Sequence, residues 1–186
     1  MIQDSDMKIV GEKPSSDVKK NKELYGDITE YEKAKANGNI KKAKELGVLL
    51  AAEFVSVCKK DELTISENDS ESLIAQKVLL LSFTVMAGLE EFCPNITIAN
   101  AARTAFFDEL NVLDKGLFEK SSDTGAFSFY YLSFRRGTEV DRRVGQTFAM
   151  LCSHDGDPIY QELGEALYCW FLSTVQNHVK KTEFVK

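Results

Sequence analysis

The feature that most constrains the fold is the spacing of apolar residues between positions 39 and 60. Apolar side chains recur there every three or four residues, while lysine and glutamate fill most other positions. An α-helix has about 3.6 residues per turn, so this spacing puts a buried stripe on one side and a wet face on the other. The stripe consists of Ile40, Ala43, Leu46, Gly47, Leu50, Ala51, Phe54, Val57 and Cys58. We therefore expect an amphipathic helix that packs one side against a core.

A second segment, at about 71–92, is apolar on nearly every side. Its run from Val78 to Leu89 contains no charged residue. That run is shorter than the roughly 20 residues of a membrane-spanning helix, so we expect a core helix and no membrane partner. A helix with so little polar surface has to be surrounded by other helices. This pattern predicts a central helix, ended at Cys93 because Pro94 disfavours helix in the residue before it.

The rest of the chain predicts an all-α fold. Gly38 and Asp157-Pro158 are typical helix-end signals, and the whole chain holds three prolines. The stretch 126–136 is rich in aromatic residues and also suits a strand, but no second strand-like segment exists to satisfy its backbone groups. We predict a single domain of about seven helices over 17–186, after a flexible N-terminal arm at 1–16. The further helices are expected at 17 or 21 to 36, 95 or 97 to 113, 126–136, 138–152 and 158–180, with a polar connection at 114–125.

The composition of the chain indicates which kinds of partner it binds and in which cellular compartment it is found. The net charge is −6 and the pI is about 5.1, which makes general nucleic-acid binding an unfavoured function. The four cysteines form no CxxC pair, and the first residues lack the apolar core of a secretory signal, so we expect reduced thiols and a cytoplasmic location. No phosphate-binding glycine loop or dinucleotide fingerprint occurs, and the sequence requires no cofactor.

The most chemically suggestive string runs from residue 152 to residue 157. An imidazole, a thiol and two carboxylates are the side chains that hold transition metals. Here they would be supplied by Cys152, His154, Asp155 and Asp157. The alternative interpretation is a glycine-containing turn in which Asp157 caps the next helix. We favour it because the only other histidine, His178, follows this string instead of preceding it, and because the string lacks the remaining ligands of a calcium-binding loop.

A cluster of arginines at 135–143 suggests an anion site. Arginine forks match phosphate and carboxylate groups, and a helix that starts at Thr138 would add free backbone N–H groups. The candidate residues are Arg135, Arg136, Arg142 and Arg143. A structural role is the competing interpretation, because arginines stabilise helix C-termini and Glu139 can pair with Arg143 four residues later.

The aromatic stretch suggests an interface. As a helix it has one apolar stripe, while Phe129 and Leu132 point to another side. A short helix with two apolar sides is either fully buried or offers one side to a partner. The stripe consists of Phe127, Tyr130, Tyr131 and Phe134.

Two hypotheses of function follow from these signals. The first is a non-enzymatic interaction or regulatory module that binds a protein partner and associates with itself as a possible homodimer. The second is a small-molecule-binding or metal-dependent hydrolase-like domain with its site near 135–157. The sequence favours the first, because no complete set of catalytic side chains is recognisable.

Overall fold

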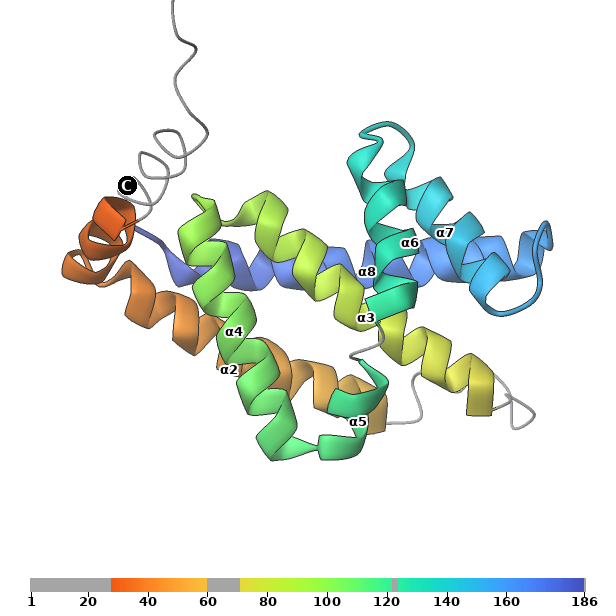
Figure 1. Ribbon diagram of the computed structural model, residues 1–186, viewed down its shortest axis with the longest axis horizontal. Helices are drawn as coiled ribbons and strands as arrows, with labels where there is room; N and C mark the ends of the chain where they lie inside the picture. Colours follow the sequence, from red (N-terminus) through yellow and green to blue (C-terminus); the bar gives the residue numbers. More distant parts are fainter. Residues whose placement is uncertain (1–27, 60–70, 122–123, 186) are drawn as a thin grey trace, which may run out of the picture.

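The computed structural model describes residues 28–59, 71–121 and 124–185, and every regular element in these ranges is a helix (Figure 1). The all-α prediction is confirmed. The proposed arm at 1–16 lies outside the described residues. Residues 28–36 are helical, and seven labelled helices follow: α2 (Asn39–Lys59), α3 (Glu71–Phe92), α4 (Ile96–Leu113), α5 (Lys115–Lys120), α6 (Thr124–Arg135), α7 (Val140–Leu151) and α8 (Pro158–Thr182).

The apolar helix α3 is central, as predicted, because it packs against two different hydrophobic clusters. One of its sides carries Val78, Leu81, Val85 and Leu89, and the other carries Leu79, Leu80, Phe83 and Ala87. By length and composition alone α3 could also cross a membrane, but 67% of its most apolar stretch is buried inside the molecule. Two buried sides on one helix explain why its sequence lacks a polar face.

The first cluster, which we call the α2–α4 cluster, joins α2, α4, one side of α3 and the C-terminal half of α8. Gly47 allows α2 and α4 to touch, since a Cβ there would collide with the carbonyl oxygen of Ala102. Phe54 lies at the centre, with ring centroids 5.6 Å from Phe106 and 6.3 Å from Phe171. This half of the core is built from closely packed hydrocarbon and phenyl groups.

The second cluster, the α6–α7 cluster, lies against the other side of α3 and the N-terminal half of α8. Tyr130 of α6 stacks on Phe83 with ring centroids 5.2 Å apart. Gly145 of α7 brings that helix against the backbone of α8, where a Cβ would meet the carbonyl oxygen of Gln161. Helix α8 therefore runs along both clusters and ties them together (Figure 1).

The predicted helix ends hold at two positions. Asn95 caps α4 through a 2.9 Å hydrogen bond from the Ile98 N–H to its side chain. Asp157 caps α8 in the same way, accepting from the Ile159 N–H at 2.9 Å, and Pro158 is the first helical residue. Both caps satisfy backbone donors that the first helical turn leaves free.

Two expectations about helix ends were wrong. The connection at 114–125 contains helix α5, because the Asp114 side chain accepts from the Leu117 N–H at 3.0 Å and starts a new turn there. Helix α7 begins at Val140 instead of Thr138. Glu139 precedes it in a left-handed conformation with φ of 48°, and its side chain makes no capping hydrogen bond. Thr138, whose side chain is a favourable helix cap, is therefore not the residue that precedes α7.

Candidate functional site

An apolar groove of about 740 Å³ lies where the α6–α7 cluster meets α3, α4 and α5, and we call it the α5–α6 groove. It collects side chains from four consecutive helices, from Met86 of α3 to Leu132 of α6. Three of its lining side chains are phenylalanines, and the rest are one tyrosine, one leucine, one methionine and two serines. They are Met86, Phe107, Phe118, Ser121, Phe127, Ser128, Tyr131 and Leu132.

One side of the groove is built on the corner between α4 and α5. Phe118 of α5 packs edge-to-face on Phe107 of α4, with ring centroids 6.3 Å apart. The corner is held by Asp114, whose carboxylate lies 3.1 Å from the Lys59 ammonium. The Leu117 N–H and then Lys59 hold the pKa of Asp114 below its usual value, because both stabilise the charged carboxylate. A local cap and an ion pair therefore position the aromatic wall.

The opposite side of the groove is α6, which buries one face and displays the other. Ala126 and Tyr130 are buried in the α6–α7 cluster. Phe129 is 50% exposed and Leu132 is 61% exposed, although both are large apolar side chains. Leu132 lines the groove, whereas Phe129 lies outside it on the same helix. The exposed apolar surface therefore extends along α6 beyond the groove.

The structure divides the four predicted interface residues between the core and the groove. Tyr130 is fully buried, and Phe134 is half-buried with its ring 6.4 Å from that of Phe83. Phe127 and Tyr131 line the groove. The exposed side of α6 is therefore carried by Phe129, Tyr131 and Leu132, and of these three the predicted stripe included Tyr131 but not Phe129 or Leu132.

Six further lining residues were not predicted as interface residues from the sequence: Met86, Phe107, Phe118, Ser121, Ser128 and Leu132. Met86, Phe107 and Phe118 come from other helices, and no short-range pattern connects them with α6. Leu132 was visible as an apolar residue off the main stripe. Together with Phe129, it was the signal in the sequence of a second apolar side on this helix.

The predicted arginines do not share one set of contacts. Arg135 turns back along α6, where its Nε donates to the Tyr131 hydroxyl at 2.9 Å and its guanidinium lies 5.1 Å from the ring centroid. Arg142 lies 3.8 Å from the Glu139 carboxylate, so that glutamate pairs with Arg142 instead of the expected Arg143. Arg136 is exposed and Arg143 is half-buried. A joint anion site at these residues stays a prediction.

The string at 152–157 forms a helix-ending turn. The His154 N–H donates to the Ala149 carbonyl at 2.8 Å and the Ser153 N–H donates to the Met150 carbonyl at 3.0 Å, the pairing that ends many helices. Ser153 takes the left-handed conformation, with φ of 62°. The His154 ring stacks on Tyr160 at 3.8 Å. These contacts give the histidine a structural role in the turn.

The four side chains proposed as metal ligands do not assemble. Among the residues that the structure describes, no three His, Cys, Asp or Glu side chains are placed to hold one ion. Asp157 is engaged in capping α8, and burial raises the pKa of the Cys152 thiol to about 11, which disfavours the thiolate that binds metals. Asp155 is exposed in the turn. The geometry lends no support to a metal centre there.

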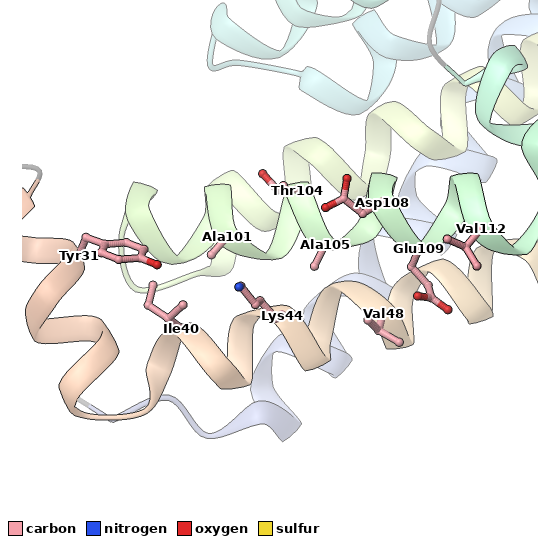
Figure 2. Close-up of a pocket in the computed structure, with 10 residues that line it drawn as sticks. All are labelled: Tyr31, Ile40, Lys44, Val48, Ala101, Thr104, Ala105, Asp108, Glu109 and Val112. Carbon is pink, nitrogen blue, oxygen red and sulfur yellow. The ribbon is translucent and has the colours of Figure 1, made fainter.

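A second hollow, of about 440 Å³, runs between α2 and α4. Figure 2 shows Lys44 and Val48 of α2 facing the α4 side, with Ala105 opposite them and Asp108 on the same helix. Its lining mixes aliphatic side chains and one tyrosine with one ammonium group and two carboxylates, the second from Glu109. It offers fewer large apolar surfaces than the α5–α6 groove.

The chemistry of the α5–α6 groove is the burial of apolar groups. Its eight lining residues include no carboxylate, imidazole, thiol or amine. The Ser121 hydroxyl donates to the Leu117 carbonyl at 2.6 Å, so the hydroxyl hydrogen is already engaged. No protein-family model, curated protein or solved structure matches the chain. The groove is therefore the feature from which a function can be argued.

Proposed function

We propose that this protein is an interaction module that docks a helix of a partner protein in the α5–α6 groove. The observation that carries the proposal is the groove itself, an open apolar hollow beside the exposed side chains of Phe129 and Leu132. Soluble proteins rarely leave a continuous apolar patch uncovered unless something binds it.

The kind of side chain in the groove supports a protein ligand. Aromatic residues and methionine are enriched in the centres of protein interfaces. Met86 adds an unbranched, adaptable side chain next to the rings of Phe107 and Phe127. Grooves of this type take the apolar face of an amphipathic helix through residues spaced three and four apart. Burying Leu132 completely would contribute about 1.5–3 kcal/mol to such a complex.

Self-association is the second candidate, because exposed apolar side chains and the groove that could accept them lie on the same surface. In a two-fold dimer each copy offers the same patch, so a protruding side chain must meet a cavity in that patch. Leu132 projects beside the groove and also lines it, and Phe129 projects one turn away. A second copy of the chain could therefore insert these side chains in the way a partner helix would.

The test is photo-crosslinking in the source cells with benzoylphenylalanine placed at Leu132. The matched control carries the same group at Ile159, which is 73% exposed at the start of α8 and outside the groove. We expect a discrete crosslinked product from position 132 and none from position 159. A product of twice the 20.9 kDa chain mass identifies self-association, and another mass identifies a partner. Equal labelling from both positions, or none from position 132, would contradict the proposal.

A further inference from the structure

The charges around the groove define the kind of helix that fits it. We infer that the occupant is an acidic amphipathic helix, with carboxylates flanking its apolar face, and this inference rests on the proposed function. Three arginines are associated with lining residues of the groove, by direct contact, by a shared hollow or by position in the chain, although the chain as a whole carries a net charge of −6. They are Arg103, Arg135 and Arg136.

Arg135 is tied directly to a lining residue. Its Nε donates to the Tyr131 hydroxyl at 2.9 Å, and its guanidinium lies 5.1 Å from the centroid of that ring. One edge of the guanidinium is used in this contact, which leaves its terminal nitrogens to meet an incoming carboxylate. Because the contact fixes the side chain before binding, less conformational entropy is lost when the ion pair forms.

Arg136 and Arg103 add positive charge near two further lining residues of the groove, Leu132 and Met86. Arg136 directly follows the last residue of α6, four residues after Leu132 in the sequence, and it is exposed. Arg103 precedes Phe107 by four residues on α4. It also lines a small hollow together with Met86, a residue that the groove shares.

Few negative groups oppose these arginines. Within the described ranges, none of the three arginines forms an ion pair, and Arg103 donates to the Asn100 side-chain oxygen at 2.7 Å. Glu90 shares the small hollow with Arg103 and partly offsets it. On α5, Glu119 lies 3.7 Å from Lys115, so these two charges neutralise each other.

This arrangement favours an acidic helix over the other occupants. Carboxylates beside the apolar face would meet guanidinium groups, whereas a basic helix would be repelled by them. A second copy would bring the same three arginines to the contact, and like charges there oppose a two-fold dimer. The groove supplies apolar affinity, and the three arginines supply the preference for negative charge.

The experiment selects ligands from a displayed library of helical peptides. The apolar positions follow the three- and four-residue spacing of an amphipathic helix, and the polar positions are randomised among glutamate, glutamine and lysine. Selection uses the full chain, with counter-selection against the Leu132→Glu variant. We expect glutamate to be enriched at polar positions, and the best peptides to bind the Arg135→Gln/Arg136→Gln variant about three- to tenfold more weakly.

The outcomes separate the inference from the proposed function. Selected peptides that are neutral or basic would overturn the acidic preference and leave the groove as a docking site. Failure to enrich any peptide over the Leu132→Glu control would overturn both. A dimer of the chain alone, dissociated by Leu132→Glu in light scattering, would replace the acidic helix with a second copy. Affinity that persists at about 1 M salt, where the Debye length is roughly 3 Å, would also contradict a role for the arginines.

Discussion

The two halves of the core differ in how completely they cover their apolar residues. In the α2–α4 cluster, Phe54, Phe106 and Phe171 are fully buried and pack on one another. In the α6–α7 cluster, the large buried rings include Tyr130 and Tyr168, which bring hydroxyl groups into the core. That second half also displays a row of apolar side chains along the outside of α6.

The difference shows how a short helix can act as scaffold and surface together. Helix α6 buries Tyr130 and Ala126 on one side, and on its other side no helix in the described part of the chain covers Phe129 and Leu132. Helix α2 has a single buried stripe along its length, and most of its apolar residues are buried in the core. We therefore expect substitutions in the α2–α4 half to change stability, and substitutions on the outside of α6 to change binding.

The largest expected effect is that of Phe54→Ala. Removing a fully buried ring leaves a cavity between Phe106 and Phe171, so the free energy of unfolding should fall by about 3–5 kcal/mol. The matched variant Phe129→Ala removes the same side chain from the exposed side of α6 and should cost about 1 kcal/mol or less. Urea denaturation of both variants measures the difference, and similar losses would contradict the contrast between the two halves.

The next effect comes from Gly47→Ala, which tests the close contact of α2 with α4. The added methyl group would collide with the Ala102 carbonyl oxygen and lie 2.8 Å from the Ala105 Cβ, so the helices must separate. We expect a loss of about 1–3 kcal/mol in the free energy of unfolding. Gly116→Ala is the control, because its nearest neighbour would be the Asp114 side chain at 3.4 Å. A harmless Gly47→Ala would show that this half packs loosely.

A pH dependence of about 1 kcal/mol is expected from Cys58. Burial, and then the charge of Asp114, raise the pKa of this thiol from 9.0 to about 12. The folded chain therefore keeps the proton while the unfolded chain loses it, and stability falls as the pH rises from about 9 toward 12. Between pH 8 and pH 10, the Cys58→Ser variant should lose about 1 kcal/mol less stability than the parent chain.

Denaturant titrations at the two pH values measure this difference. The offset between the proteins at pH 8 cancels, because each is compared with itself at pH 10. An identical loss in the parent and in Cys58→Ser would contradict a buried, protonated thiol in the α2–α4 half.

An effect of similar size but opposite sign, a gain of stability, is expected from Tyr130→Phe. The Tyr130 hydroxyl is buried and has no hydrogen-bond partner among the protein atoms of the described chain. Removing a buried, unsatisfied hydroxyl should stabilise the fold by about 1 kcal/mol, and the ring contact with Phe83 is kept. Thermal unfolding monitored by circular dichroism measures the change. A lower midpoint would mean that the hydroxyl contributes to the fold.

Most of the fold could be predicted because helical spacing is a local property. The stripe from Ile40 to Val57 and the caps at Asn95 and Asp157 depend on residues a few positions apart. Helix α5 was missed because six residues carry too little periodicity to be recognised, and Asp114 acts as a cap only in its folded context.

The candidate site could be predicted only in part. Phe127 and Tyr131 stand out in the sequence as aromatic residues four apart, whereas Met86 and Phe118 have no local pattern that assigns them to the same groove. The arginines seemed to belong to one site because they are close in sequence. In the folded chain, the contact of Arg135 with Tyr131 connects that arginine to the groove, and Arg142 pairs with Glu139 instead.

The sequence alone determined that this chain is helical and that α3 is central, because apolar spacing decides which side of each helix leaves water. Tertiary structure decided which apolar sides remained uncovered. That outcome depends on how separate helices meet in space, with α6 beside α3, α4 and α5, and on close contacts such as that of Gly47 with α4. Packing between distant segments is a property of shape, and no local pattern of residues encodes it.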